Sequence, residues 1–274
     1  MLSVAFTIRS VDEGLAEAFR WHLQPFHRTT PAPHPFPVDI FVQEEDRGSE
    51  PPTYSFFLAT ELRFRSRSLG GVLAWALWDL HATVPKRARD FLLLHAGAVA
   101  REGGAVLLPG AMDAGKSSLV LALLQAGFDY LSDEVGALDP VTQRAYPFEK
   151  RITVSPTAMR FFPELEERLQ DRQGLSAALR DRYVRPEDVG RAVAGPAPVR
   201  GVVFVSSDWE GPPRLDPVPR SEAVARMAAA SFNLYRYGER GVVLLSRVAA
   251  QAPAFELRGG TPTERAALVS ERLG

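Results

Sequence analysis

The sequence predicts a protein of the α/β class that is built from two parts. Three observations support this prediction. Strand-like and helix-like patterns alternate along most of the chain, a glycine-rich loop joins a buried strand-like run to an apolar helix-like run within 105–126, and a charged stretch at 85–90 separates two regions of different texture. We therefore expect a small α/β module over residues 1–90 and a larger α/β domain with a mixed sheet over 91–274.

The first region shows short β-like runs and two helix-like runs. The second of these helices has a wide apolar face, which is typical of a helix packed on a sheet. We expect strands at 2–8, 38–43, 53–58 and 62–66, and helices at 11–23 and 69–82. Such a module would suit the binding of a partner or substrate.

The second region begins with two strand-like runs joined by a Glu-Gly-Gly turn, which indicates a hairpin. Glycine punctuation and a capping box at Thr261 and Glu264 place the ends of its helices. We expect strands at 92–101, 105–108, 128–131, 152–154, 200–206 and 254–257, and helices at 115–126, 156–170, 220–230, 239–250 and 261–273.

The composition excludes several classes of function. Thirty-two basic residues stand against thirty-three acidic ones, so the net charge of −1 gives no global reason to bind nucleic acid or an anionic membrane. The chain has no cysteine, which excludes disulfides, thiolate metal sites and cysteine nucleophiles. The N-terminal residues do not resemble a signal peptide, and no apolar stretch of the sequence has the length of a transmembrane helix. We expect a soluble, cytoplasmic protein.

The glycine-rich loop matches the phosphate-loop pattern of glycine, four residues, and then Gly-Lys-Ser. Its residues are Gly110, Ala111, Met112, Asp113, Ala114, Gly115, Lys116, Ser117 and Ser118. The glycines allow successive N–H groups to face a phosphate, Lys116 adds a positive charge for the β- and γ-phosphates, and Ser117 can ligate Mg²⁺. The alternative is a turn that merely joins a strand to a helix. The strand-like run before the loop and the helix-like run after it favour nucleotide binding, with ATP and Mg²⁺ expected.

Two further features accompany the loop. Asp133 and Glu134 follow the next strand, where a pair of carboxylates fits a Mg²⁺ anchor and a base for a hydroxyl proton, although solvated acids are also common at strand ends. His95 lies near the start of the strand that precedes the loop strand. A histidine in such a place is either catalytic or an ordinary core or surface residue.

Together, these blocks resemble the HPr kinase/phosphorylase superfamily. The resemblance rests on the order His95, phosphate loop, short helix, and then Leu-Ser-Asp-acid at 131–134. It implies a mixed-sheet phosphate-loop fold, a hydroxyl kinase in which Asp133 takes the acceptor proton with His95 holding it, and Lys116 as the phosphate-binding cation. It also implies that Glu134 joins Ser117 and Asp133 around Mg²⁺, although the family usually has two aspartates at 133 and 134.

The chain departs from the family signature Glu-x-Arg-Gly, because Arg151 is followed by Ile152. Its layout is closer to the shorter HPr-kinase-like proteins found beside peptide natural-product genes, including lasso-peptide kinases that phosphorylate a serine of the precursor. A strand-like segment at 146–151 resembles a basic strand of those proteins. Lys150 and Arg151 would then hold the phosphate or an acidic substrate, unless they form a solvated basic turn.

Three functions remain in competition. The first is transfer of the γ-phosphate of ATP to a serine of a peptide or protein, or to a small-molecule hydroxyl. The second is a phosphate-loop ATPase or GTPase switch. The sequence lacks a guanine-binding Asn/Thr-Lys-x-Asp signature, which argues against this function. The third is a nucleotide-binding interaction module without phosphotransfer. The sequence does not predict whether ATP or GTP is preferred, and it does not predict the oligomeric state; it is compatible with an oligomer.

Overall fold

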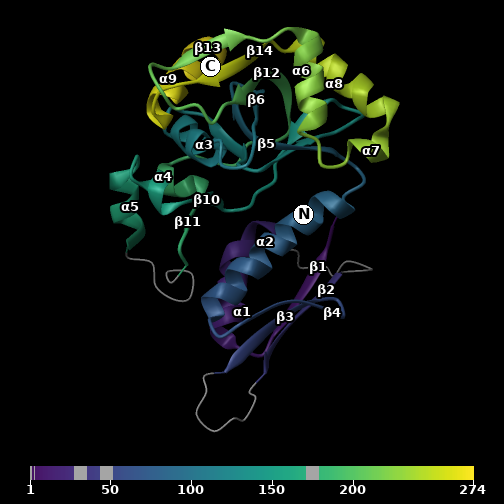
Figure 1. The fold of residues 1–274 in the computed structure, drawn as a ribbon, viewed down its shortest axis with the longest axis vertical. Helices are drawn as coiled ribbons and strands as arrows, with labels where there is room; N and C mark the ends of the chain where they lie inside the picture. The colour runs from purple at the N-terminus through teal and green to yellow at the C-terminus, as the bar shows by residue number, and fades with distance from the viewer. Residues whose placement is uncertain (1, 3, 28–35, 44–51, 171–178) are drawn as a thin grey trace. The chain divides into compact units, whose positions relative to one another are not determined.

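The chain divides into two compact units, each of which mixes helices and strands. The computed structural model describes residues 2, 4–27, 36–43, 52–170 and 179–274. The first unit comprises Met1–Ala88 with Arg168–Arg180, and the second comprises Arg89–Glu167 with Asp181–Gly274. Figure 1 labels the elements of both units. The predicted α/β class is confirmed, whereas the grouping of the segment 168–180 with the first unit was not predicted.

The first unit is a four-stranded sheet with two helices. The strands lie in the order β1-β2-β3-β4, with β1 parallel to β2 and the other neighbours antiparallel. Asp12 and Ser68 cap the two helices by accepting hydrogen bonds from backbone N–H groups of the first turn. The elements are β1 (Phe6–Ser10), α1 (Glu13–Leu23), a 3-10 helix (Gln24–Phe26), β2 (Phe36–Gln43), β3 (Thr53–Leu58), β4 (Glu61–Ser66) and α2 (Leu69–Arg87).

The second unit is organised around an eight-stranded mixed sheet. Its strands are β5 (Leu92–Arg101), β6 (Gly104–Pro109), β7 (Asp129–Ser132), β8 (Val135–Leu138), β9 (Arg144–Tyr146), β12 (Ala197–Val205), β13 (Arg214–Pro217) and β14 (Ala254–Arg258). The main path runs β13-β14-β12-β6-β5-β8-β9, and β7 pairs with β5. β12 is parallel to both β6 and β14, so the loops that follow these three strands leave from one edge of the sheet.

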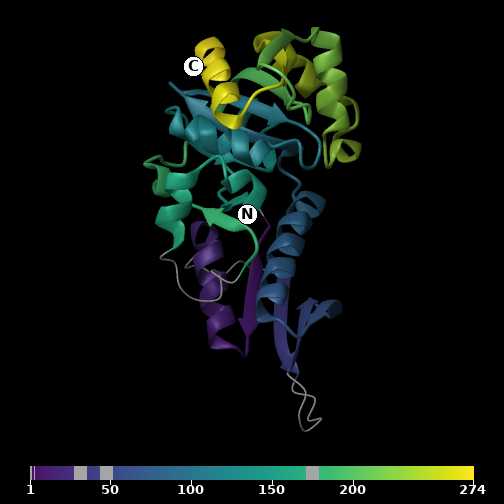
Figure 2. The same cartoon turned by 60° about the vertical axis from the view of Figure 1, so that its left-hand side comes forward.

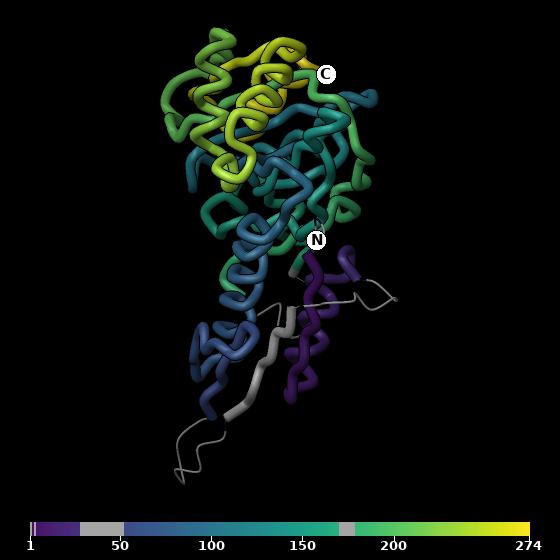
Figure 3. The backbone as a smooth tube through the Cα atoms, turned by 90° about the vertical axis from the view of Figure 1, so that its right-hand side faces the viewer, coloured from purple at the N-terminus to yellow at the C-terminus, as the bar shows by residue number. Residues whose placement is uncertain are grey.

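Helices cover both faces of this sheet, as Figures 1 and 2 show. Helices α3 (Lys116–Gln125) and α9 (Pro262–Leu273) pack together on one face, and α6 (Arg220–Ala229) and α8 (Glu239–Gln251) on the other. The tube in Figure 3 follows the chain to α9, shown in yellow at the C-terminus. A short helix α7 (Leu234–Tyr237) precedes α8, while α4 (Pro156–Met159), α5 (Pro163–Gln170), a 3-10 helix (Pro186–Val189) and the pair β10 (Ile152–Val154) and β11 (Arg182–Val184) complete the described elements.

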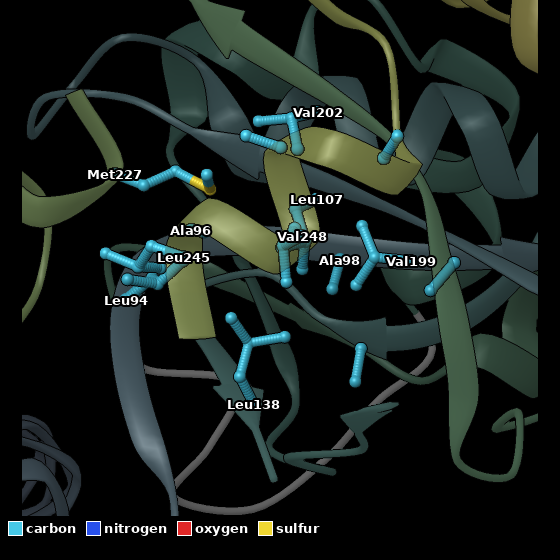
Figure 4. Packing of buried hydrophobic residues seen from close by; sticks show 14 of the residues in the cluster. Leu94, Ala96, Ala98, Leu107, Leu138, Val199, Val202, Met227, Leu245 and Val248 are labelled. Atoms are coloured by element: carbon cyan, nitrogen blue, oxygen red, sulfur yellow. The ribbon is translucent and has the colours of Figure 1, made fainter. Parts of the chain in front are cut away.

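One hydrophobic core lies between the sheet and the α6–α8 face. Alternate residues of β5, β6 and β12 point into it, because successive side chains of a strand face opposite sides. Figure 4 shows Leu94, Leu107 and Val202 meeting Met227 and Val248 of the helices. Each Å² of apolar surface removed from water stabilises the fold by about 25 cal/mol. The buried side chains of β6 therefore hold this strand, which leads into the loop 110–118, in the centre of the sheet.

The structure differs from the predicted elements at several places. The first strand, β1, covers 6–10 rather than 2–8, and β8, β9, β11, β13 and α7 were not predicted. The helix predicted over 156–170 is two helices, because Pro163 has no N–H to donate and begins a new helix instead. Of the strand predicted at 146–151, only Tyr146 lies in a strand, at the end of β9, and 147–151 is irregular. Helix α2 continues past Pro85, since the Ala88 N–H still bonds to the Val84 carbonyl at 2.8 Å. Among the described residues, no helix has the length and apolarity to cross a membrane.

Candidate functional site

The loop between β6 and α3 has the backbone shape that its sequence requires. Asp113 and Gly115 adopt positive φ angles of 60° and 89°, in the left-handed region that turns N–H groups toward one side. Ala114 is buried, whereas Met112 is 74% exposed at the crest of the loop. The hairpin of β5 and β6 and the start of α3 at Lys116 are confirmed, so the strand–loop–helix context of the motif is present.

Lys116 closes over the loop. Its Nζ donates hydrogen bonds to the carbonyl oxygens of Gly110 at 3.1 Å and Ala111 at 2.7 Å. Burial lowers the pKa of Lys116, and the charges of Glu134, Asp133 and Asp113 offset only part of this effect. A phosphate placed in the loop would supply the negative charge that this buried ammonium group lacks at close range.

The two acids lie in the tight turn between β7 and β8. The Ser132 hydroxyl shapes this turn by accepting hydrogen bonds from the N–H groups of Glu134 at 3.2 Å and Val135 at 2.9 Å. Asp133 points inward and is 2% exposed, whereas the side chain of Glu134 is 40% exposed. The turn therefore presents one buried and one accessible carboxylate beside the loop.

Asp133 is the centre of a hydrogen-bond network. Its Oδ2 accepts from the Ser117 hydroxyl at 3.0 Å and from the Thr153 backbone N–H at 3.1 Å. The Tyr130 hydroxyl lies 2.9 Å from Oδ1 and 2.9 Å from the carbonyl of Lys150. Burial and the charge of Asp133 raise the pKa of Tyr130 well above its ordinary value, so it stays a neutral phenol that can donate. The network uses the acceptor capacity of the carboxylate almost completely.

Lys150 forms a buried ion pair with the same carboxylate. Its Nζ lies 2.9 Å from both oxygens of Asp133 and 3.5 Å from Glu134 Oε2. The other donors bond to the Arg151 carbonyl and the Thr153 hydroxyl, each at 3.2 Å. Burial alone would lower the pKa of Lys150, but Asp133 and Glu134 outweigh it and the pKa is raised. Lys150 therefore orients Asp133, and Arg151 beside it is buried rather than part of a solvated turn.

His95 lies next to the loop and the acidic turn. Its carbonyl accepts from the Gly110 N–H at 3.5 Å, and it pairs with Val135 across β5 and β8. Burial, together with the positive charge of Lys116, lowers the pKa of His95 to about 4, so its imidazole is neutral at pH 7. Among the hydrogen bonds of these two described residues, none joins His95 to Asp133. His95 was expected to hold Asp133, but no described hydrogen bond connects the two residues. Tyr130, Thr153 and Lys150 hold Asp133 instead.

Oxygen donors converge where a divalent cation would be needed. Ser117 Oγ, Asp133 and Glu134 are hard oxygen ligands of the kind that Mg²⁺ prefers, and Mg²⁺ usually keeps waters and phosphate oxygens as its other ligands. The described residues contain no group of three or more histidines and acids that could hold a metal alone.

Three contacts of this site were missed by sequence reasoning. The tertiary structure brings Tyr130 and Thr153 to Asp133, and no sequence motif predicts these contacts. Trp209 lies against the loop at Gly115, although it is 94 positions further along the chain (209 − 115). No protein-family model matches the chain, and no curated protein sequence shows significant similarity to it.

Proposed function

We propose that this protein binds a nucleoside triphosphate, ATP with Mg²⁺, on the loop 110–118 and transfers the γ-phosphate to a hydroxyl group. The observation that carries the proposal is the joint placement of Lys116 over the loop carbonyls and of Ser117 on Asp133. These residues are adjacent in sequence but point to two different tasks, charge neutralisation and cation binding. Both tasks are required for phosphoryl transfer.

The loop residues would bind the phosphates. The N–H groups made available by the positive φ angles at Asp113 and Gly115, and those of the first turn of α3, would donate to the β-phosphate. Lys116 would exchange its two carbonyl acceptors for the β- and γ-phosphate oxygens. Because charge-assisted hydrogen bonds are about twice as strong as neutral ones, this exchange favours the bound state.

Ser117 and Glu134 would hold Mg²⁺, and Asp133 would join them once one of its present donors moves away. The cation would neutralise charge that develops between the β- and γ-phosphates. Ser117 donates its only proton to Asp133, so the lone pairs of its oxygen remain available to a metal. Glu134 is accessible enough to reach the same place.

Asp133 would also accept the proton of the acceptor hydroxyl. In the transfer step the acceptor oxygen forms a bond to the γ-phosphorus, the bond from that phosphorus to the bridging oxygen breaks, and the nucleoside diphosphate leaves. The hydroxyl proton would go to Asp133 after one of its present donors moves away. Lys150, the most firmly held donor, would keep the carboxylate aimed during this exchange.

The acceptor is proposed to be a serine of a peptide or protein, such as a natural-product precursor, on the strength of the sequence resemblance. A small-molecule hydroxyl belongs to the same reaction class. The first unit, with its own sheet and helices, would offer a separate surface for such a substrate.

A second candidate, nucleotide hydrolysis by a switch protein, is favoured by one observation. Asp133 is surrounded by donors, and no described hydrogen bond joins it to His95, so the carboxylate proposed as the base is already occupied in this arrangement. If Asp133 keeps these partners with nucleotide bound, it would orient groups around the cation without accepting a proton. Release of phosphate to water, with no acceptor modified, would then be the observed activity.

Mass spectrometry of reactions with Mg-ATP separates these candidates. The acceptors to test are precursor peptides encoded near the gene, HPr and free serine. We expect a gain of one phosphate on an acceptor hydroxyl and its loss in Lys116→Ala. Lys86→Ala is the matched control, because Lys86 is exposed on α2 of the first unit. Consumption of ATP without a modified acceptor would support the switch, and no nucleotide binding at all would overturn the proposal.

A further inference from the structure

Trp209 lies at the sheet edge that carries the phosphate loop. It belongs to the loop 206–213 that follows β12, the parallel neighbour of the phosphate-loop strand β6. The next parallel strand, β14, is followed by Gly259 and Gly260 at the same edge. In open α/β sheets, ligands bind outside the carboxyl ends of neighbouring parallel strands. Trp209 is therefore on the side of the loop where the rest of a bound nucleotide would extend.

The indole ring touches the phosphate loop itself. A Cβ atom built on Gly115 would lie 2.2 Å from Cζ2 and 2.6 Å from Cη2 of Trp209, so only glycine leaves room for this ring. Gly115 immediately precedes Lys116 and is the N-cap residue of α3. Trp209 is half-buried, so its six-membered ring meets the loop while part of the side chain stays accessible.

Arg265 also contacts the indole ring. Its guanidinium carbon lies 3.6 Å from the ring centroid, in a stacked cation–π contact. The guanidinium donates to the carbonyls of Gly259 at 2.6 Å, Ser206 at 3.1 Å and Asp208. Arg265 is fully buried and donates its hydrogen bonds to the backbone, so it supports the indole ring rather than binding a ligand. We call Trp209, Arg265 and the two loops that they join the Trp209 platform.

Backbone hydrogen bonds make the platform rigid. The Gly259 N–H bonds to the Asp208 carbonyl and the Gly260 N–H to the Gly211 carbonyl, each at 2.9 Å. The two loops that follow β12 and β14 are thus joined on both sides of Trp209. An aromatic ring that is fixed before binding loses little conformational entropy when a ligand stacks on it.

From this geometry we infer that Trp209 stacks on the base of the nucleotide whose phosphates occupy the loop 110–118. The inference rests on the proposed nucleotide site and adds the part that recognises the base. Stacking on an aromatic side chain tolerates any base, because every base has a π face. Trp209 would therefore select a nucleotide over inorganic polyphosphate, and it would discriminate only weakly between ATP and GTP.

The test compares Mg-ATP with Mg-tripolyphosphate by isothermal titration calorimetry on wild type, Trp209→Ala and Trp209→Phe. We expect Trp209→Ala to weaken ATP binding about 5- to 100-fold and to leave tripolyphosphate binding unchanged. Trp209→Phe should retain most of the ATP affinity. Trp78→Ala is the matched control, because Trp78 is 54% exposed on α2 of the first unit.

Each other outcome has a definite meaning. Unchanged ATP binding in Trp209→Ala overturns the inference and leaves the proposed function intact. Equal weakening of both ligands shows that Trp209 only shapes the loop through Gly115, which also overturns it. Failure of wild type to bind either ligand removes both the proposed function and the inference.

A fluorescence measurement avoids any change at Trp209. The chain has four tryptophans, and the other three are Trp21, Trp75 and Trp78, so their joint replacement by phenylalanine leaves Trp209 as the only one. We expect Mg-ATP to quench the remaining emission and Mg-tripolyphosphate to leave it nearly unchanged. Equal responses to both ligands would contradict stacking.

Discussion

Lys150 and Asp133 form an ion pair that is almost completely withdrawn from water, with side chains 3% and 1% exposed and Nζ 2.9 Å from the carboxylate. Residues 17 positions apart are joined in this way because the irregular segment after β9 folds back onto the β7–β8 turn. Isolated charges cannot be buried cheaply, so each partner makes the burial of the other tolerable. The pair is therefore a structural requirement of the site.

Removal of the cation should therefore destabilise the protein strongly. Lys150→Met keeps the length of the side chain but leaves Asp133 as a buried charge without its partner. We expect a loss of about 3–5 kcal/mol in the free energy of unfolding, measured by urea denaturation. The double variant Lys150→Met/Asp133→Asn should lose less than the sum of the two single variants. Additive losses would show that the two residues do not stabilise each other.

The proposed role of Asp133 in transfer leads to a second prediction. Asp133→Asn keeps the shape of the side chain, but it removes the charge that would receive a proton and leaves Lys150 without its ionic partner, so binding and transfer are compared for the folded variant. If the protein is a kinase, we expect ATP affinity within a few-fold of wild type and a turnover rate lower by about 10²–10⁴-fold. Binding is measured by calorimetry and transfer by mass spectrometry. Glu134→Gln, at the accessible neighbour, should lose less; full activity in Asp133→Asn would assign the proton to another group.

The parts of the fold that could be predicted are those with local signals. The hairpin of β5 and β6 follows from its Glu-Gly-Gly turn, and α9 begins where Thr261 and Glu264 form the predicted capping box. The loop 110–118 was placed correctly between strand and helix because its glycines and apolar flanks are contiguous in sequence. Its ligand and activity remain predictions.

The parts that could not be predicted depend on contacts between distant segments. Lys150 was predicted either to hold phosphate or an acidic substrate or to lie in a solvated basic turn. It is buried, and its donors bond to Asp133, Arg151 and Thr153, because the fold brings a second loop under the acidic turn. Hydrophobic periodicity reports which face of an element is buried but not which loop meets another. The platform of Trp209 and Arg265 was missed for the same reason.

His95 provides a prediction about pH. Its pKa is lowered from the ordinary value of 6.5 to about 4, first by burial and then by the charge of Lys116. In the unfolded chain the same histidine takes up a proton near pH 6.5, so the unfolded state binds more protons between pH 6.5 and pH 4. The neutral histidine therefore imposes no cost above pH 6.5, and stability falls as the pH drops through this window.

The measurement is the thermal midpoint of wild type and His95→Gln across this range. We expect wild type to lose stability more steeply than His95→Gln between pH 6.5 and pH 4, and the two curves to run parallel above pH 7. Other titrating groups act on both proteins and cancel in the difference. Parallel curves over the whole range would mean that His95 titrates normally in the folded state.

Asn233 provides the last prediction. It is the only asparagine in the chain, and it is fully buried in the turn before α7. Its Oδ1 accepts from the Leu93 N–H and its Nδ2 donates to the Phe91 carbonyl, both at 2.9 Å. The side chain thus gives the start of β5 the two hydrogen bonds that a neighbouring strand would provide, and β5 is the strand that carries His95.

Asn233→Ala should remove the side-chain partners of the buried Leu93 N–H in β5 and of the part-buried Phe91 carbonyl just before β5. We expect a loss of about 1–3 kcal/mol in the free energy of unfolding, measured by urea denaturation. Asn233→Asp should also be destabilised, because a carboxylate cannot donate to the Phe91 carbonyl and places a charge in a buried site. Gln251→Ala, an exposed amide at the end of α8, is the matched control and should change stability by less than about 0.5 kcal/mol. If Asn233→Ala unfolds at the same denaturant concentration as this control, the start of β5 does not depend on the asparagine.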